Sequence, residues 1–450
     1  MAQSVERAVS HATRLQANAL TFFDNIVIGM ASTAPACSLA TALGGLVAIM
    51  GWSSPLEILI NFFPMLGIAI AFYYLNRYDK PSAGGCFTWV SGIMNPHVGY
   101  LTGWAIIAAE LMDLIAGSVP AGAYTLQMIH PAWVNNTLAV SIVGALWFLV
   151  VTAVVVWGIR RVARLQWIMM AFEYAMLIGF SVWAFIKEGS HLLSGTATMW
   201  SHFAFHGTFG DFAQGATVAI FIYWGFDTIT NVGEESKNPS KNPGKASVFS
   251  TFILLALFLG TTMAVESVLS SHAIVHHSDD VLAYFANQLA PAPWGDLMIL
   301  AVLFSTLATL ETGILPIARV AYEMSNKRVF PRVFREIHPI FRNPVKGTLI
   351  LAALTIIGLF SMNFVTSVGK FLADAVNNIG IMVAFYYGVT GWAAAWYFRR
   401  NVLQWKLAIW GIAVPFISGA YLFLMGGVTL WENGWATAWP ALLIFLTGIP

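Results

Sequence analysis

Two apolar stretches of the sequence carry chain-breaking residues near their centres. In one, small and polar residues lead to Pro35, which lacks a backbone N–H and clashes with the carbonyl four residues back. In the other, an aromatic run leads to Gly225, which tolerates non-helical dihedral angles. Each feature alone is as consistent with a kink as with a break. A true break frees N–H groups that attract an anion and carbonyls that accept from an ammonium group.

Interruptions in corresponding spans of two halves are the sequence pattern of transporters built from inverted repeats. Pro35 falls in the first and Gly225 in the sixth of the spans assigned below, so each lies in the opening helix of a five-helix half. No residue-level similarity between the halves is apparent. The pattern predicts substrate binding at both interruptions. Ser32, close to Pro35 in the first interruption, and Gly225 in the second are predicted binding residues.

Several carboxylates fall inside apolar stretches, where an ionisable group costs at least about 2.5–3.5 kcal/mol and is a functional candidate by default. Glu110 and Asp113 are spaced i, i+3 and share a helix face, which suits either a cationic substrate or proton relay, or a structural pair. Glu311 faces the same choice. We interpret Asp227 as structural, capping the sixth span or pairing with a neighbour. The candidates for proton coupling or gating are Glu110, Asp113, Glu173, Asp227 and Glu311.

The composition excludes a soluble fold. Hydrophobic residues make up 58% of the 450 residues and charged residues 10%, against roughly 45–50% and 25% in soluble domains. A net charge of +1 and scattered basic residues exclude nucleic acid as a partner. No phosphate-binding G-x-x-x-x-G-K-[ST] motif occurs, so ATP-driven pumping is not indicated and gradients must drive transport. Both cysteines are interpreted as packing residues, and no metal or other cofactor is expected.

Apolar windows long enough to cross a membrane recur along the chain. They predict about twelve transmembrane helices, eleven complete and one shortened. The spans run near Leu20 to Met50, Leu56 to Asn76, Val98 to Met128, Val134 to Gly158, Ala163 to Lys187, Phe212 to Glu234, Ala246 to Ser270, Trp294 to Met324, Gly347 to Met362, Phe371 to Phe398, Leu407 to Gly427 and Trp435 to Pro450.

Lysines and arginines gather after every even-numbered span, and loops rich in them stay in the cytoplasm. This predicts a multi-pass protein of the plasma (inner) membrane with a cytoplasmic N-terminus. The spans and their orientation together divide the chain into a cytoplasmic segment at 1–19, a first repeat at 20–187, a second repeat at 210–398 and additional helices at 405–450.

Polar groups near the span ends have competing interpretations. Glu234, Glu235 and Arg319 near the inner end suit a cytoplasmic gate or a surface ion pair, and we favour the gate. Asp24 and Glu266 are expected to be solvated. Seven histidines fall in outer loops, where solvated loop polarity is favoured over a pH sensor. They are His130, His191, His202, His206, His272, His276 and His277.

Four segments resemble the amino acid, polyamine and organocation transporter superfamily, from the first span to about the eleventh. Tyr223-Trp224-Gly225-Phe226-Asp227 with Glu234-Glu235-Ser236-Lys237-Asn238-Pro239 is similar to its F-x-G-F-D…E-E-x-K-N-P signature. The loop Pro81-Ser82-Ala83-Gly84-Gly85-Cys86-Phe87, leading to Gly103-Trp104, resembles P-x-x-G-G-x-Y…G-W. The junction around Gly158 and Arg164 and the exit of the eighth span, Arg319 to Pro331, also match.

The resemblance implies ten core helices in the leucine-transporter arrangement, with two further helices outside. It implies substrate contacts at both interruptions, with Phe221 as an aromatic lid. The implied contact residues are Ala31, Thr33, Ala34 and Pro35 on the first span and Phe221, Ile222, Tyr223 and Trp224 on the sixth. It also puts Glu173 where proton-coupled members often carry a lysine in place of a sodium ion, so Glu173 either carries the coupling proton or is structural, paired with a first- or eighth-span polar group. The family usually has G-x-G where this chain has Thr33-Ala34-Pro35, so one carboxylate-binding N–H is absent.

The leading functional prediction is proton-coupled uptake of an amino acid by alternating access. The alternatives are import of a polyamine or other organocation, exchange of an amino acid against an amine, and sodium-coupled symport. The expected partners are a small amino acid or amine and membrane lipid. An integral membrane acyltransferase is disfavoured, because the histidines cluster in outer loops, and a non-transporting receptor on the same fold is the remaining rival.

Overall fold

The computed structural model describes residues 15–79, 82–194, 202–205, 207–278, 280–291, 293–364, 368–434 and 447–448, and these are mostly helical, with no strand among them. The long helices are α2 (Phe22–Thr33), α3 (Pro35–Met50), α4 (Ser54–Tyr78), α6 (Pro96–Ile129), α7 (Thr137–Trp157), α8 (Ile159–Ser194), α9 (Phe209–Tyr223), α11 (Asn242–Val268), α14 (Trp294–Asn326), α15 (Val345–Ser361), α16 (Val368–Phe398) and α18 (Val414–Glu432). The short ones are α5 (Gly85–Ile93), α10 (Thr228–Asn231), α12 (Ser271–His276), α13 (Val281–Leu289) and α17 (Trp405–Leu407), with 3-10 turns η4 (Gly233–Glu235) and η5 (Arg332–Arg335) and a π-helical segment η7 (Ala408–Ala413).

Nine helical stretches of the described chain are long and apolar enough to span a membrane. This number is compatible with the predicted helices, because the stretch Phe22–Tyr78 contains both the first and the second span. The sixth span is absent from the nine because it is divided into α9 and α10, and α9 has only 15 residues. The twelfth predicted span, 435–450, lies outside the described residues except for 447–448.

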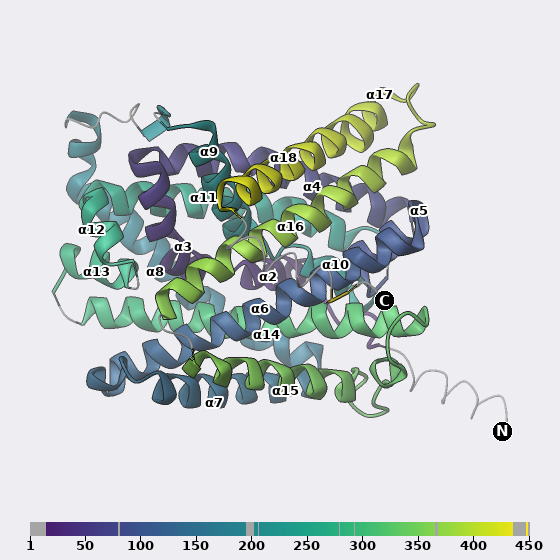
Figure 1. The fold of residues 1–450 in the computed structure, drawn as a ribbon, viewed down its shortest axis with the longest axis horizontal. Helices are drawn as coiled ribbons and strands as arrows, with labels where there is room; N and C mark the ends of the chain where they lie inside the picture. The colour runs from purple at the N-terminus through teal and green to yellow at the C-terminus, as the bar shows by residue number, and fades with distance from the viewer. Residues whose placement is uncertain are drawn as a thin grey trace.

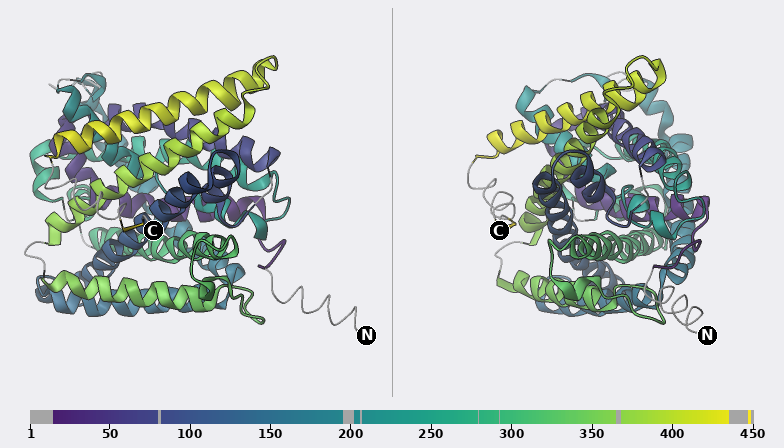
Figure 2. Two further views of the ribbon diagram at one scale, coloured as in Figure 1. Left: turned by 45° about the vertical axis from the view of Figure 1, so that its right-hand side comes forward. Right: turned by 90° about the vertical axis from the view of Figure 1, so that its right-hand side faces the viewer.

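Several long helices, among them α7, α14 and α15, lie side by side along the long axis of the molecule, and α16 and α18 run obliquely to it (Figure 1). α7 and α15 form one edge, α18 lies at the opposite edge, and the interrupted helices lie between them in both turned views (Figure 2). α14 and α16 are central, since 83% of the most apolar window of each is buried, against 33% for the segment Trp405–Glu432. We call the end where α4 and α16 finish, beside Arg77 and Arg399, the basic end. The opposite end, where α6 finishes at His130, is the histidine end.

The first span is broken at Ala34, as its sequence predicts. Ala34 adopts a left-handed conformation, with φ 46° and ψ 69°, and its N–H donates to the carbonyl of Met30. Pro35 then occupies the first turn of α3, where a missing N–H costs nothing. A non-glycine residue in this conformation costs about 1 kcal/mol or more and persists only where the surroundings hold it.

The sixth span breaks after Tyr223, where Trp224 is extended and Gly225 has φ +118°. Gly225 lies against the break in the first span, because a Cβ added to it would stand 2.6 Å from the carbonyl carbon of Ser32 and 2.7 Å from the nitrogen of Thr33. The two interruptions are therefore in direct contact, and glycine is required both by its conformation and by this approach.

The two interrupted spans also begin alike. Thr21 and Asp24 form a capping box at the start of α2, and Thr208 and Asp211 form the same box at the start of α9. Each lies in a T-F-x-D sequence, a local likeness between the halves that the sequence comparison missed. The capping boxes satisfy orphan N–H groups at opposite ends of the bundle. This correspondence agrees with the inverted-repeat arrangement.

Candidate functional site

A cavity lies at the contact between the two breaks. It extends from them toward the histidine end, because its walls are the first turns of α3, the second half of α6 and the first third of α16. The interrupted spans contribute Ser32, Thr33, Ala34, Cys37, Ser38, Thr41, Phe221 and Trp224. The other walls contribute Asp113, Ala116, Gly117, Pro120, Thr309, Leu372, Ala375, Val376 and Ile379.

Half of the predicted binding residues line this cavity and half pack behind it. The cavity-lining half consists of Ser32, Thr33, Ala34, Phe221 and Trp224. Ala31, Ile222 and Tyr223 are completely buried, and the Tyr223 hydroxyl donates to the carbonyl of Ile58 at 3.2 Å. Pro35 starts α3 and Gly225 touches α2, so both shape the break without lining the cavity.

The N–H groups freed at the start of α3 are held by the protein itself. Ala36 donates its backbone N–H to Glu173 Oε1 at 2.8 Å, and Cys37 donates its N–H to Ser305 Oγ at 3.1 Å. Ser305 Oγ in turn donates to the same Glu173 oxygen at 2.8 Å. Glu173, which belongs to α8, is fully buried and its Oε2 has no hydrogen-bond partner among the described residues. The anion-binding position of this half-helix is thus filled by a side chain of α8.

Four of the five hydroxyl groups that line the cavity donate their protons to backbone carbonyls, and the fifth, Ser32 Oγ, shares a hydrogen bond of 2.8 Å with Thr228 Oγ1. Thr33 donates to Gly29 at 3.0 Å and Ser38 donates to Thr33 at 2.6 Å. Thr41 donates to Cys37 at 2.8 Å, and Thr309 donates to Ser32 at 3.1 Å. The oxygens of these hydroxyls keep lone pairs that face the cavity. A ligand would therefore meet mainly hydrogen-bond acceptors.

Asp113 is the one acidic or basic side chain among the described residues that line the cavity. Glu110 lies one turn deeper on α6 and is buried; a Cβ added to Gly313 would stand 3.1 Å from its Oε2, and its Oε1 has no partner among the described residues. Of the two carboxylates predicted to share a helix face, Asp113 therefore lines the cavity and Glu110 is enclosed below it. A carboxylate and several acceptor oxygens suit a ligand with cationic N–H donors.

Asp227 anchors the floor of the cavity through two tyrosines of α16. Tyr387 donates to its Oδ1 at 2.8 Å and Tyr386 donates to its Oδ2 at 3.1 Å. The hydroxyl of Tyr386 also accepts a hydrogen bond from the indole N–H of Trp224. Trp224 is thereby fixed against the cavity by a relay to a completely buried carboxylate.

Glu311 lies apart from these groups, toward α8. Its Oε2 accepts from Gln166 Nε2 at 2.6 Å, and Gln166 also donates to the carbonyl of Ala308 at 3.0 Å. Its Oε1 has no partner among the described residues. Of the five carboxylates predicted for proton coupling or gating, Asp113 thus lines the cavity and the other four are buried around it.

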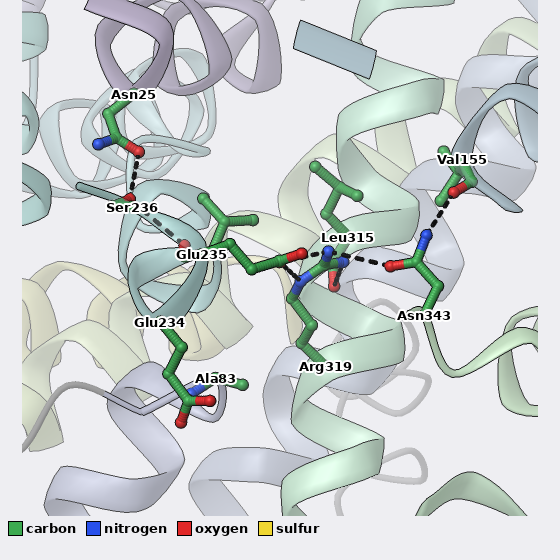
Figure 3. A network of polar contacts seen from close by, with 10 residues as sticks. Asn25, Ala83, Val155, Glu234, Glu235, Ser236, Leu315, Arg319 and Asn343 are labelled. Atoms are coloured by element: carbon green, nitrogen blue, oxygen red, sulfur yellow. Dashed lines mark hydrogen bonds and ion pairs between the residues drawn. The ribbon is translucent and has the colours of Figure 1, made fainter. Parts of the chain in front are cut away.

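A buried ion pair lies at the basic end, below the cavity (Figure 3). Glu235 and Arg319 meet at 2.6 Å with exposed side-chain fractions of 0% and 1%, so the surface ion pair considered from sequence is wrong. Arg319 also contacts Asn343, whose Nδ2 donates to the carbonyl of Val155 at 2.7 Å. The pair therefore joins η4 to α14, α7 and the start of α15.

The same closure includes the segment before α2. The N–H groups of Ala19 and Leu20 both donate to the Glu235 carbonyl, at 2.7 and 3.1 Å, and Lys237 returns an N–H to the carbonyl of Leu20. Ser236 donates to Asn25 at 2.9 Å, and the Glu234 carboxylate accepts from the Ala83 N–H at 3.1 Å (Figure 3). Contacts from several described parts of the chain thus converge at this end.

Two expectations for the histidine end are wrong. Glu266, expected to be solvated, is 4% exposed, and His202 is 1% exposed; His202 Nδ1 and Glu266 Oε2 are 2.7 Å apart. The ring of Trp52 packs edge-on against His202 at 5.4 Å between ring centroids. Sequence reasoning missed this pair, because the acidic residue at a helix end meets a histidine that is 64 positions away in the chain.

Other residues of the site also escaped sequence reasoning. Ser305 and Thr309 lie on the α14 face that meets the broken first span, and their polar side chains inside an apolar helix were the available signal. Leu372, Ala375, Val376 and Ile379 form the α16 wall. Their apolar pattern looks like that of any packed helix, so nothing in the sequence distinguishes them.

Comparison with known proteins agrees with this architecture. A family model described as amino acid permease matches residues 15–449. The chain is 26% identical over 344 residues to the low-affinity putrescine importer PlaP of Escherichia coli (strain K12), covering 71% of this chain and 69% of that protein. It is 24% identical over 390 residues to the serine/threonine exchanger SteT of Bacillus subtilis (strain 168), with coverages of 82% and 81%. It is 23% identical over 394 residues to the methylthioribose transporter of the same organism, with the same coverages. Since the family match spans nearly the whole chain, this polytopic helical protein is a membrane transporter of the amino acid permease family.

Proposed function

We propose that this transporter carries small organic cations, such as a monoamine or a diamine, by alternating access. The observation that carries the proposal is the polarity of the cavity. Asp113 is the one carboxylate among its described lining residues, and the hydroxyls of Thr33, Ser38 and Thr309 offer acceptor oxygens because their protons are used on backbone carbonyls. An ammonium group supplies up to three donors and a positive charge, which match this lining.

The start of α3 argues against a substrate carboxylate at the position where the sequence analysis expected one. Glu173 and Ser305 already accept from the free N–H groups of Ala36 and Cys37. A second carboxylate there would meet the charge of Glu173 and find its donors occupied. An amine without a carboxylate therefore fits better than an α-amino acid. One relative is named a putrescine importer, which lends independent support.

Glu173 is the proposed carrier of the coupling proton. Its Oε1 is fixed by two donors, while its buried Oε2 has no partner among the described residues and is the atom available for a proton. Protonation would weaken the hold of α8 on α3 and so link proton binding to movement at the break. The closed basic end and the cavity reaching toward the histidine end fit a state open to the outside, with the basic end cytoplasmic.

Uptake into proteoliposomes tests these assignments. The purified protein should accumulate radiolabelled putrescine or a monoamine in a saturable manner, faster with an imposed pH gradient that is acidic outside and equally well without sodium. Serine and threonine should compete poorly. Saturable serine uptake with no amine uptake would overturn the amine proposal. Strict dependence on sodium would overturn the role of Glu173 and leave the amine proposal standing.

A further inference from the structure

A second hollow lies on the outside of the bundle, away from the cavity between the breaks. It is a groove between α4, α11 and η7 near the basic end, with a volume of about 340 Å³. That volume is at the lower end of the roughly 300–1,000 Å³ of ligand pockets. The groove is lined by Ile70, Tyr73, Tyr74, Lys245, Val248, Phe249 and Trp410.

The apolar part of the groove is open to its surroundings. Phe249 is 56% exposed and Trp410 is 43% exposed. Trp410 lies in η7, a π-helical segment that interrupts the regular ladder between α17 and α18. Such segments are rare and occur often at functional sites. On a protein that spans a membrane, this face meets lipid, and a tryptophan near a bundle end is typical of the level where acyl chains meet headgroups.

Positive charge borders the groove at its basic end. Lys245 lines it directly, in the first turn of α11, and no described carboxylate lies within ion-pair distance of this lysine. Arg77, in the last turn of α4, is exposed and donates to the hydroxyl of the lining residue Tyr73 at 2.9 Å. Lys406 lies four residues before Trp410 and is also exposed. Cations thus border the groove from α4 and α11, while the ammonium of Lys406 lies over the ring of Trp405, 5.6 Å from its centroid.

The geometry points to a binding site for an anionic phospholipid in this groove. The phosphate and headgroup would lie between Lys245 and the Arg77–Tyr73 pair, where cations and a hydroxyl supply donors. One acyl chain would lie along Ile70, Val248, Phe249 and Trp410. Juxtamembrane basic residues gain about fivefold in affinity for anionic lipid surfaces per charge, so a zwitterionic lipid of the same chains binds more weakly.

The site adjoins the closure of the basic end. Under the groove α4 and α11 pack closely, since a Cβ added to Gly244 would stand 2.7 Å from the Cα of Tyr73. Asn76 of α4 donates to the carbonyl of Pro239 at 2.8 Å, in the loop that follows Glu235 and Ser236. A lipid that clamps α4 to α11 would therefore stabilise the loop that keeps the basic end shut.

The test compares phosphatidylglycerol with phosphatidylcholine of identical chains, added to the purified full chain in detergent. Native mass spectrometry should show one saturable phosphatidylglycerol molecule bound more tightly than phosphatidylcholine, and thermal melting should show greater stabilisation. Lys245→Gln should weaken phosphatidylglycerol binding roughly fivefold and leave phosphatidylcholine unchanged. Trp410→Ala should weaken both lipids.

The matched control is Arg332→Gln, which removes an exposed basic residue from η5 at the same end but outside the groove; it should change neither affinity. Arg77→Gln provides a second headgroup variant at an exposed position that does not threaten folding. Equal binding of the two lipids, or an unchanged preference in both Lys245→Gln and Arg77→Gln, would overturn the proposal. Melting in phosphatidylcholine verifies that each variant is folded.

Discussion

Glu173 on α8 accepts the backbone N–H of Ala36, 2.8 Å away at the broken start of α3. The same oxygen accepts the hydroxyl of Ser305 from α14. One buried carboxylate therefore links the broken span to two helices of the surrounding bundle. It also fills the anion position that an interrupted helix offers, which changes the chemistry expected of the substrate.

Replacing Glu173 with glutamine removes the ionisable carboxyl group and keeps an oxygen that accepts hydrogen bonds. The amide oxygen still accepts from Ala36, but the side chain no longer binds and releases a proton. We expect Glu173→Gln to abolish the stimulation of uptake by a pH gradient while counterflow, which needs no net proton movement, persists. The measurement is amine uptake and counterflow in proteoliposomes.

Ser305→Ala is the companion variant, since it removes one donor to Glu173 and keeps the carboxylate. It should retain gradient-driven uptake with stability lower by about 1 kcal/mol. Gradient-driven uptake that survives in Glu173→Gln would rule out this residue as the proton carrier.

Asp113→Asn should weaken amine binding. The substitution removes the one charged side chain of the described cavity lining, and a hydrogen bond to a charged group contributes about 1.5–3 kcal/mol. Affinity should fall about tenfold to a hundredfold, as measured by competition uptake or by thermal stabilisation with the amine. Asp296→Asn, an exposed acid in the first turn of α14, should leave affinity unchanged. Equal effects of the two variants would contradict the assignment.

Gly225→Ala should abolish transport. A Cβ at this position would stand 2.6 Å from the carbonyl of Ser32, and the backbone φ of +118° is strained for any other residue. The two breaks would be forced apart, so both affinity and transport rate should fall. Gly260→Ala on α11 has open space for its Cβ and is the matched control. Normal uptake by Gly225→Ala would show that the contact between the breaks is not required.

Arg319→Gln should open the basic end. It leaves Glu235 buried without its partner, and breaking one side of a buried pair costs about 3–5 kcal/mol. Cys37 lines the cavity, so its labelling by a membrane-impermeant maleimide from the basic side should rise in a Cys86→Ser background. Glu336→Gln breaks only the exposed pair with Lys346 and should leave labelling unchanged. Labelling as slow as in the parent would argue against a gate.

His202→Ala should destabilise the histidine end. The substitution leaves the buried Glu266 without its one described hydrogen-bond partner, at a cost of about 1.5–3 kcal/mol. The melting temperature should fall clearly. His277→Ala, which breaks a pair with Asp280 that is about one-third exposed, should change it little. Similar melting of both variants would mean that the His202–Glu266 contact contributes no stability.

The sequence by itself determined the helical membrane fold, the spans and the two breaks. The length of each apolar stretch shows whether it can cross the membrane. Pro35 and Gly225 change the backbone within a few residues of themselves, so the spans and the breaks can both be recognised from local sequence. Four short motifs, among them the one that spans Tyr223–Asp227 and Glu234–Pro239, indicated the family. The T-F-x-D repeat at the starts of α2 and α9 was equally local but too short to stand out.

Only the tertiary structure decided which groups meet. Glu173 reaches Ala36 across 137 positions of sequence, and Glu235 reaches Arg319 across 84. Hydrophobic periodicity orients a helix toward the bundle but does not fix its rotation and depth against each neighbour. These two variables decide that Asp113 faces the cavity while Glu110, one turn away, is enclosed. They also place His202 against Glu266, because burial of a loop depends on the helices that pack over it.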